Sequence, residues 1–173
     1  MITVSIKGLR DGKHPIEATE QCSAVAHLAQ EFIGIITVKG TLRKHGKRYL
    51  LTITAEAPAS LTCDISGEEF IDTISTTFEL EYIANTTMAN LHARSIEREP
   101  PYYIREDATC IDITDDVRQE LTVSLPMKRI APQHHNKDFA ELFPQFTQQD
   151  DITANEHTID PRWAALKSIT FDQ

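Results

Sequence analysis

Basic side chains crowd one short stretch of the chain, where they could bind the phosphate groups of a nucleic acid. The candidate contacts are Lys39, Arg43, Lys44, Lys47 and Arg48. Cations at this density can neutralise RNA phosphates, the interaction that supplies most of the sequence-independent affinity. The stretch lacks the exposed aromatic residues that stack on single-stranded bases. A second interpretation stays open, in which the charges only keep an exposed hairpin from pairing with other sheet edges.

A cysteine and a histidine could form a nucleophile and its base. Cys63 with His134, His135 or His157 is such a combination, but a chain with three cysteines and seven histidines offers such pairs by chance. A buried reduced cysteine is more often a small apolar filler. The sequence has no Gly-x-Ser-x-Gly elbow, no phosphate-binding glycine-rich loop and no His-Glu-x-x-His motif. We therefore expect no catalytic residue, no enzyme activity and no small-molecule substrate.

Possible metal ligands gather in a polar stretch toward the C-terminus. They are His134, His135, Asp150, Asp151, Glu156 and His157. Adjacent side chains rarely ligate one ion together, and histidines spaced three or four residues apart are missing. No Cys-x-x-Cys pair supplies thiolates for zinc. We expect no metal site and no cofactor.

The composition indicates one ordinary globular domain. Of 173 residues, 40% are hydrophobic and 25% are charged. No apolar run approaches the roughly 20 residues that cross a bilayer, and the first residues do not resemble a secretory signal. Three widely spaced cysteines fit reduced thiols better than a disulfide framework. These features predict a cytoplasmic protein that does not enter a membrane.

Charge is distributed unevenly along the chain. Residues 1–60 hold 8 Lys and Arg against 5 Asp and Glu, a balance of +3, whereas residues 61–173 carry −12 of the total of −9. An acidic half repels nucleic-acid phosphates and favours basic protein partners, while the first half can still present a local basic patch.

Hydrophobic alternation and β-branched residues predict a fold built mainly from strands. The expected strands are 2–6, 32–42, 49–57, 60–65, 69–83 and 110–113. Short connections at 44–47, where Gly46 can adopt positive φ, and at 66–68 predict antiparallel hairpins. Residues 16–30 receive no assignment, since their apolar spacing is weak. Residues 85–107, which contain Pro100-Pro101, are expected to form a long loop.

Two or three short helices are expected toward the C-terminus. Thr114 is a credible N-cap for the first, which buries Val117, Leu121 and Leu125 and ends at Pro126. A second helix opens at Asp160-Pro161 and docks through Trp163, and a further short helix near 137–143 stays open. The predicted class is α+β, an antiparallel meander whose closure into a partial barrel is left open. We expect a single domain, 1–173, with a core over about 1–130, a polar tail at 132–158 and a closing helix at 160–170.

Three segments together resemble the YceD family, the large ribosomal RNA subunit accumulation proteins. Residues 61–70 (LTCDISGEEF) resemble its strand, Cys-x-x-Cys turn and strand. Residues 111–127 resemble its Ile-Asp-Leu strand, acidic helix start and Leu-Pro ending, and residues 160–166 (DPRWAAL) its closing helix. The order and spacing of these segments agree with those of the family over roughly residues 33–169. The matching positions are Cys63, Gly67, Phe70, Asp112, Leu125, Pro126, Asp160, Pro161 and Arg162.

The chain departs from this pattern in two places. Ser66 stands where the family has its second cysteine, and residues 131–135 (APQHH) replace a cysteine-rich knuckle that many members carry. A zinc site of those relatives therefore does not transfer.

The resemblance implies a non-enzymatic factor that supports synthesis, processing or stability of 23S ribosomal RNA in the large-subunit pathway. The partners it implies are 23S rRNA precursor and ribosomal or assembly proteins. The basic hairpin would then meet rRNA phosphates while the acidic half engages a basic protein. The alternative is a protein adaptor without direct RNA contact.

Overall fold

The computed structural model describes residues 1–92, 100–134 and 141. The chain divides into two units, Met1–Ala131 and Pro132–Gln173, and nearly all of the described residues belong to the first. Its strands are β1 (Thr3–Ser5), β2 (Gly12–Gln21), β3 (Ile35–His45), β4 (Arg48–Thr62), β5 (Glu69–Ala84), β6 (Tyr102–Ile104) and β7 (Cys110–Asp112). Its helices are α1 (Thr86–His92) and α2 (Thr114–Val123), and a 3-10 turn occupies Cys22–Ala24.

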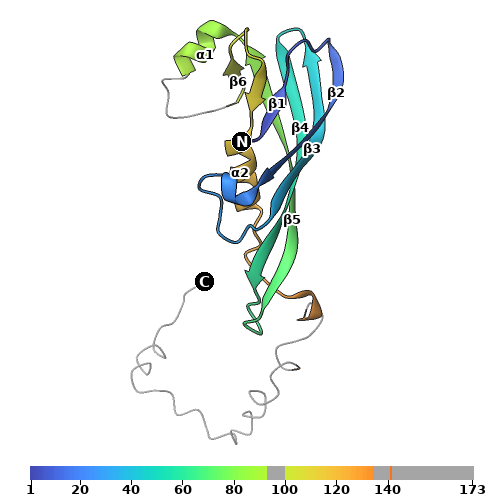
Figure 1. Cartoon of the computed structure of the whole chain (residues 1–173), viewed down its shortest axis with the longest axis vertical. Helices are drawn as coiled ribbons and strands as arrows, with labels where there is room; N and C mark the ends of the chain where they lie inside the picture. The colour runs from blue at the N-terminus through green and yellow to red at the C-terminus, as the bar shows by residue number, and fades with distance from the viewer. Residues whose placement is uncertain (93–99, 135–140, 142–173) are drawn as a thin grey trace, which may run out of the picture. The chain divides into compact units, whose positions relative to one another are not determined.

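A five-stranded sheet in the order β2-β3-β4-β5-β6 forms the body of this unit (Figure 1). Strands β2 to β5 are an antiparallel meander, while β6 runs parallel to β5. Strands β1 and β7 pair in a separate antiparallel sheet. The α+β class and the mainly antiparallel sheet are confirmed. Within the described residues β2 and β6 are edges of an open sheet, so closure into a partial barrel is not confirmed.

The core lies on one face of the large sheet. Along β4, side chains such as Leu51, Ile53 and Leu61 alternate with exposed ones and have at most 1% of their surface exposed. Helix α2 supplies Val117 and Leu121 to the same core, and both are fully buried. Period-two burial of this kind leaves the opposite face of the sheet to solvent.

Strand β2 and the segment 85–107 differ from the sequence-based prediction. The sequence pattern does not reveal strand β2, because Ile16 is its one buried apolar residue and pairing with β3 decides its structure. The expected loop at 85–107 contains helix α1 and strand β6. The sequence predicts helices only toward the C-terminus, whereas α1 lies in the middle of the chain.

The expected strands 49–57 and 60–65 are one continuous strand that passes through Pro58. Pro58 lacks an N–H, which normally excludes proline from a central strand. Its carbonyl accepts a hydrogen bond from the N–H of Ile33 at 2.9 Å, so its nitrogen faces the same neighbouring segment. Gly34 in that segment has φ +71°, and Cys22 donates to its carbonyls, from N–H to Gly34 at 3.0 Å and from Sγ to Ile33 at 3.3 Å. These two carbonyls therefore have a hydrogen-bond donor outside β4.

Thr114 does not cap α2 in the way that the sequence predicted. It is the first residue of the helix, and its Oγ1 accepts a hydrogen bond from the N–H of Ile2 at 2.8 Å. The carboxylate of Asp112 accepts instead from the N–H of Thr114 at 3.0 Å. Thr114 thus joins β1 to α2. The predicted helices at 137–143 and 160–170, including Trp163, lie outside the described residues, apart from residue 141, and the division into core, tail and closing helix stays a prediction.

Candidate functional site

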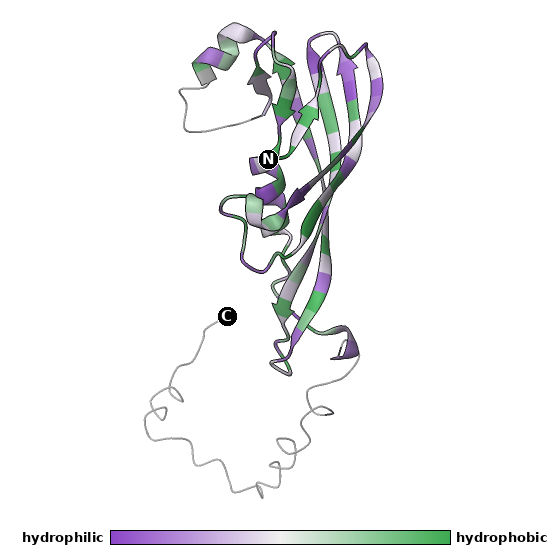
Figure 2. Ribbon diagram, in the orientation of Figure 1, coloured by the Kyte–Doolittle hydropathy of each residue, from purple (hydrophilic) through white to green (hydrophobic). Residues whose placement is uncertain are grey.

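The outer face of the sheet, meaning the face of β2–β5 opposite the core, carries the exposed side chains of these strands. On β3 the core-facing side chains of Ile36, Val38 and Leu42 are at most 1% exposed, and the residues between them point outward. In Figure 2 the ribbons alternate between hydrophilic and hydrophobic residues in the same way. Residues on the outer face can therefore act together, although they come from different strands.

Three of the five predicted RNA contacts lie on the outer face. Lys39 and Arg43 have the outward parity of β3, and Arg48 opens β4 opposite His45. Arg43 and Lys39 are exposed, and no carboxylate of the described residues lies within ion-pair distance of either. Arg48 lies 3.6 Å from Glu81, with 69% of its side chain exposed. These three cations stay accessible to a ligand.

The other two predicted contacts are directed elsewhere. Lys44 has the core-facing parity of Leu42, and its Nζ lies 2.9 Å from the carboxylate of Asp11. This hydrogen bond, with one from the N–H of Gly46, lowers the pKa of Asp11. Lys47 lies in the turn, with its Nζ 2.6 Å from Glu106. Lys44 in particular holds the turn in place and does not belong to the outer face.

Lys13 on β2 is a further cation of the outer face, which the sequence pattern does not predict. It is exposed and pairs across the strands with Arg43. Two like charges directly opposite each other are destabilising unless an anion lies near. Within the described part of the chain no ion pair forms at Lys13. Only recognition of β2 as a strand and of its register could have revealed the pair.

We call Lys13, Arg43 and Arg48 the basic end of the outer face. All three lie near the β3–β4 turn, where Gly46 has φ +57°. Lys39 differs from them, because Glu17 lies directly opposite it on β2. Its charge is partly offset, and it belongs to the margin of this group.

Cys63 occupies a different and enclosed environment at the far end of β4. Its Sγ is 3.4 Å from the backbone N–H of Ala131, which donates to it. That donor, followed by the hydroxyl of Ser66 and the N–H groups of Ser66 and Ile65, lowers the pKa of the Cys63 thiol to about 7. The residue is only 1% exposed, so its thiolate has little access to a substrate.

Two stretches that resemble the YceD family meet at this point. Gly67, at φ +74°, donates from its N–H to the carbonyl of Cys63 at 2.8 Å and closes the turn. Asp64 and Arg129 exchange two hydrogen bonds of 2.7 Å each, which tie the turn to the segment that follows Leu125 and Pro126. Asp160, Pro161 and Arg162 lie outside the described residues.

The residues around Cys63 do not fit the zinc site of the relatives. A zinc site needs several thiolates or imidazoles, whereas Ser66 and the backbone of Ala131 surround a single thiol. No group of three or more His, Cys, Asp or Glu that could hold a metal occurs in the residues that the structure describes.

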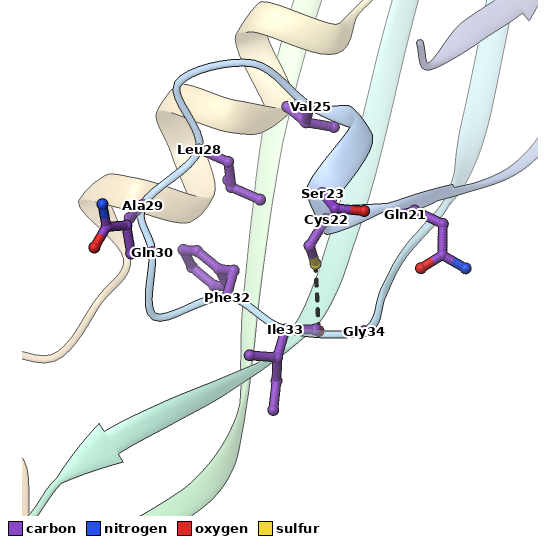
Figure 3. A pocket seen from close by; sticks show the side chains of 10 residues that line it. All are labelled: Gln21, Cys22, Ser23, Val25, Leu28, Ala29, Gln30, Phe32, Ile33 and Gly34. Atoms are coloured by element: carbon purple, nitrogen blue, oxygen red, sulfur yellow. Dashed lines mark hydrogen bonds between the residues drawn. The ribbon is translucent and has the colours of Figure 1, made fainter.

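A pocket of about 450 Å³ lies in the segment that joins β2 to β3 (Figure 3). Of the described residues that line it, Cys22 alone is ionisable, and its Sγ donates to the carbonyl of Ile33 at 3.3 Å. Burial raises the pKa of this thiol, which favours its neutral form. Among the residues that the structure describes, no carboxylate, imidazole or amine lines the pocket beside this thiol. The thiol therefore has no neighbour among them that could act as its base.

The comparison with protein families matches residues 51–170 to the model described as large ribosomal RNA subunit accumulation protein YceD. The chain belongs to the YceD family. The match contains both stretches that meet at Cys63, and it begins in β4 of the large sheet. The family's description concerns accumulation of ribosomal RNA and names no catalysed reaction. Neither the search of curated proteins nor the search of solved structures returned a match.

Among residues 1–92 and 100–134, no helix is long and apolar enough to cross a bilayer.

Proposed function

We propose that this YceD protein is a non-enzymatic factor that supports 23S rRNA in large-subunit assembly by holding rRNA phosphates on its basic end. Family membership supports the link to ribosomal RNA. The observation that carries the proposed contact is the cross-strand pair of Lys13 and Arg43, with Arg48 beside it on the outer face. A phosphate between the two facing cations would relieve their mutual repulsion.

The proposed contact is electrostatic and positions the RNA without reading its sequence. The basic end has no exposed aromatic side chain, and the core-facing Tyr49 is 8% exposed. Base stacking of the kind used for single-stranded RNA is therefore not part of the proposal. The remaining, acidic part of the chain would engage basic ribosomal or assembly proteins, which limits RNA contact to this end.

Salt-dependent binding tests this proposal. A transcribed segment of 23S precursor would be titrated with the full chain and with K13Q/R43Q over a range of salt concentrations. Each lost phosphate contact should reduce the slope of log affinity against log salt by about 0.7 for single-stranded RNA.

The matched control is K7Q/K128Q. It removes the same charge from two exposed lysines that lie outside the sheet. It should change the slope little, because neither lysine lies on the outer face. Equal slopes for K13Q/R43Q and the unmodified chain would overturn the proposed contact.

A protein adaptor without RNA contact is the second candidate function. It is favoured by the net charge of −9 and by exposed isoleucines at the other end of the outer face. In that case the chain would bind an assembly protein, and no precursor RNA would bind.

A further inference from the structure

Exposed isoleucines mark the end of the outer face opposite to the basic end. Ile33, Ile35 and Ile71 expose 37%, 49% and 66% of their surfaces. Large aliphatic side chains at such exposure lose favourable burial, and a group of them on one face usually marks an interaction surface.

Backbone contacts place Ile33 and Ile71 on either side of Pro58, and Ile35 opens β3 two residues after Ile33. Ile33 donates from its N–H to the carbonyl of Pro58 at 2.9 Å. On the other side Pro58 pairs with Thr73, and Ile71 lies one outward position further along β5, opposite Ser60. Neighbours on a diagonal of this kind are about 7–8 Å apart, which is within reach of long side chains. We call Ile33, Ile35, Pro58 and Ile71 the apolar end.

Acidic residues flank the apolar end along its own strands. Glu56 precedes Pro58 by two residues on β4, and Glu69 precedes Ile71 by two residues on β5, so each carboxylate shares the outer face. Both are exposed. In the part of the chain that the structure describes, neither forms an ion pair. Both carboxylates are therefore available to a cationic partner.

We propose that the apolar end binds a segment of a basic protein in which aliphatic residues alternate with lysine or arginine. The aliphatic side chains would cover the isoleucines, and the cations would pair with Glu56 and Glu69. This inference gives a site to the protein partner of the proposed function, but it does not depend on RNA contact at the basic end. The same carboxylates would repel RNA phosphates.

A second copy of this chain fits the surface less well. A symmetric contact at the apolar end would bring Glu56 and Glu69 of both copies close together, and each copy carries a net charge of −9. Charge complementarity thus selects a basic partner.

The test uses a short fluorescent peptide of Lys-Leu-Arg-Gly repeats and the full-length protein, with binding followed by fluorescence anisotropy. Two comparison peptides replace the leucines with serine or the cations with glutamate. I35T/I71T keeps β-branched side chains in both positions but removes apolar surface, and it should weaken binding about tenfold or more. E56Q/E69Q should weaken binding and reduce its dependence on salt.

V123T/M127T is the control, because Val123 and Met127 are largely exposed and lie in and after α2. It should bind the peptide like the unmodified chain. No binding by the unmodified chain, equal binding of the serine peptide, or equal loss in the control would overturn the proposal. So would self-association that I35T/I71T abolishes, since a second copy would then be the occupant. RNA binding by I35T/I71T should be unchanged, which separates this test from that of the basic end.

Discussion

Replacing Gly40 with alanine should destabilise the sheet at its centre. Gly40 lies on β3 between Ile16 of β2 and Ile53 of β4. A Cβ at this position would lie 2.2 Å from the backbone oxygen of Thr52 and 3.0 Å from the Cα of Ile53. Neither atom belongs to a side chain that can rotate away, so the two strands must separate by about 1 Å to restore van der Waals contact.

The expected cost combines two effects of that separation. Overpacking of a well-packed core typically costs about 1–3 kcal/mol. A weakened ladder hydrogen bond adds about 1 kcal/mol, giving about 2–4 kcal/mol for Gly40→Ala. In a urea titration followed by circular dichroism, a loss of this size lowers the midpoint by about 1–2 M.

Gly67→Ala is the matched control for this prediction. Gly67 has φ +74° and open space where a Cβ would lie, so the substitution adds conformational strain without a clash. We expect it to cost about 1–2 kcal/mol. If Gly40→Ala were no more destabilising than Gly67→Ala, the close approach of β3 and β4 at Gly40 would be refuted.

Three further predictions concern Cys63 and Thr114. Ser66→Ala removes a hydrogen-bond partner of the Cys63 thiolate and should raise the pKa of Cys63 above about 7. Ultraviolet absorbance of the thiolate measures this pKa. An unchanged pKa would contradict the role of Ser66. Because the pKa of Cys63 is lowered from its ordinary value of 9.0, its contribution to stability is full above pH 9 and is lost as the pH falls through about 7. Urea midpoints should therefore rise from pH 7 to 9, and this rise should be smaller in Cys63→Ser. Thr114→Val leaves the N–H of Ile2 without its acceptor and should cost about 1–3 kcal/mol, whereas a cost near zero would show that β1 is not joined to α2 through this hydroxyl.

The central hairpin could be predicted because local signals agree there. β-Branched residues fill the two strands, and Gly46 supplies the positive φ that the turn requires. The same alternation also determines which face each side chain joins. It separates Lys44 from Arg43, a distinction that proximity in sequence does not reveal.

Other parts of the fold depend on neighbours that a local pattern does not contain. Strand β2 has too few apolar residues for its sequence alone to predict a strand. The outward position of Lys13 on that strand could therefore not be predicted either. The two strands predicted on either side of Pro58 are one strand, β4, and the carbonyls of Ile33 and Gly34 in the neighbouring segment accept hydrogen bonds from Cys22. Such contacts come from tertiary structure and leave no periodic signal.

Accumulation of 23S rRNA in cells tests the central claim most directly. A strain that lacks this protein would be supplied with the unmodified chain, K13E/R43E or the control K7E/K128E, at equal protein levels, and the ratio of 23S to 16S rRNA would be measured. The unmodified chain and the control should restore the ratio, and K13E/R43E should not. Full restoration by K13E/R43E would contradict a role for the basic end in supporting 23S rRNA.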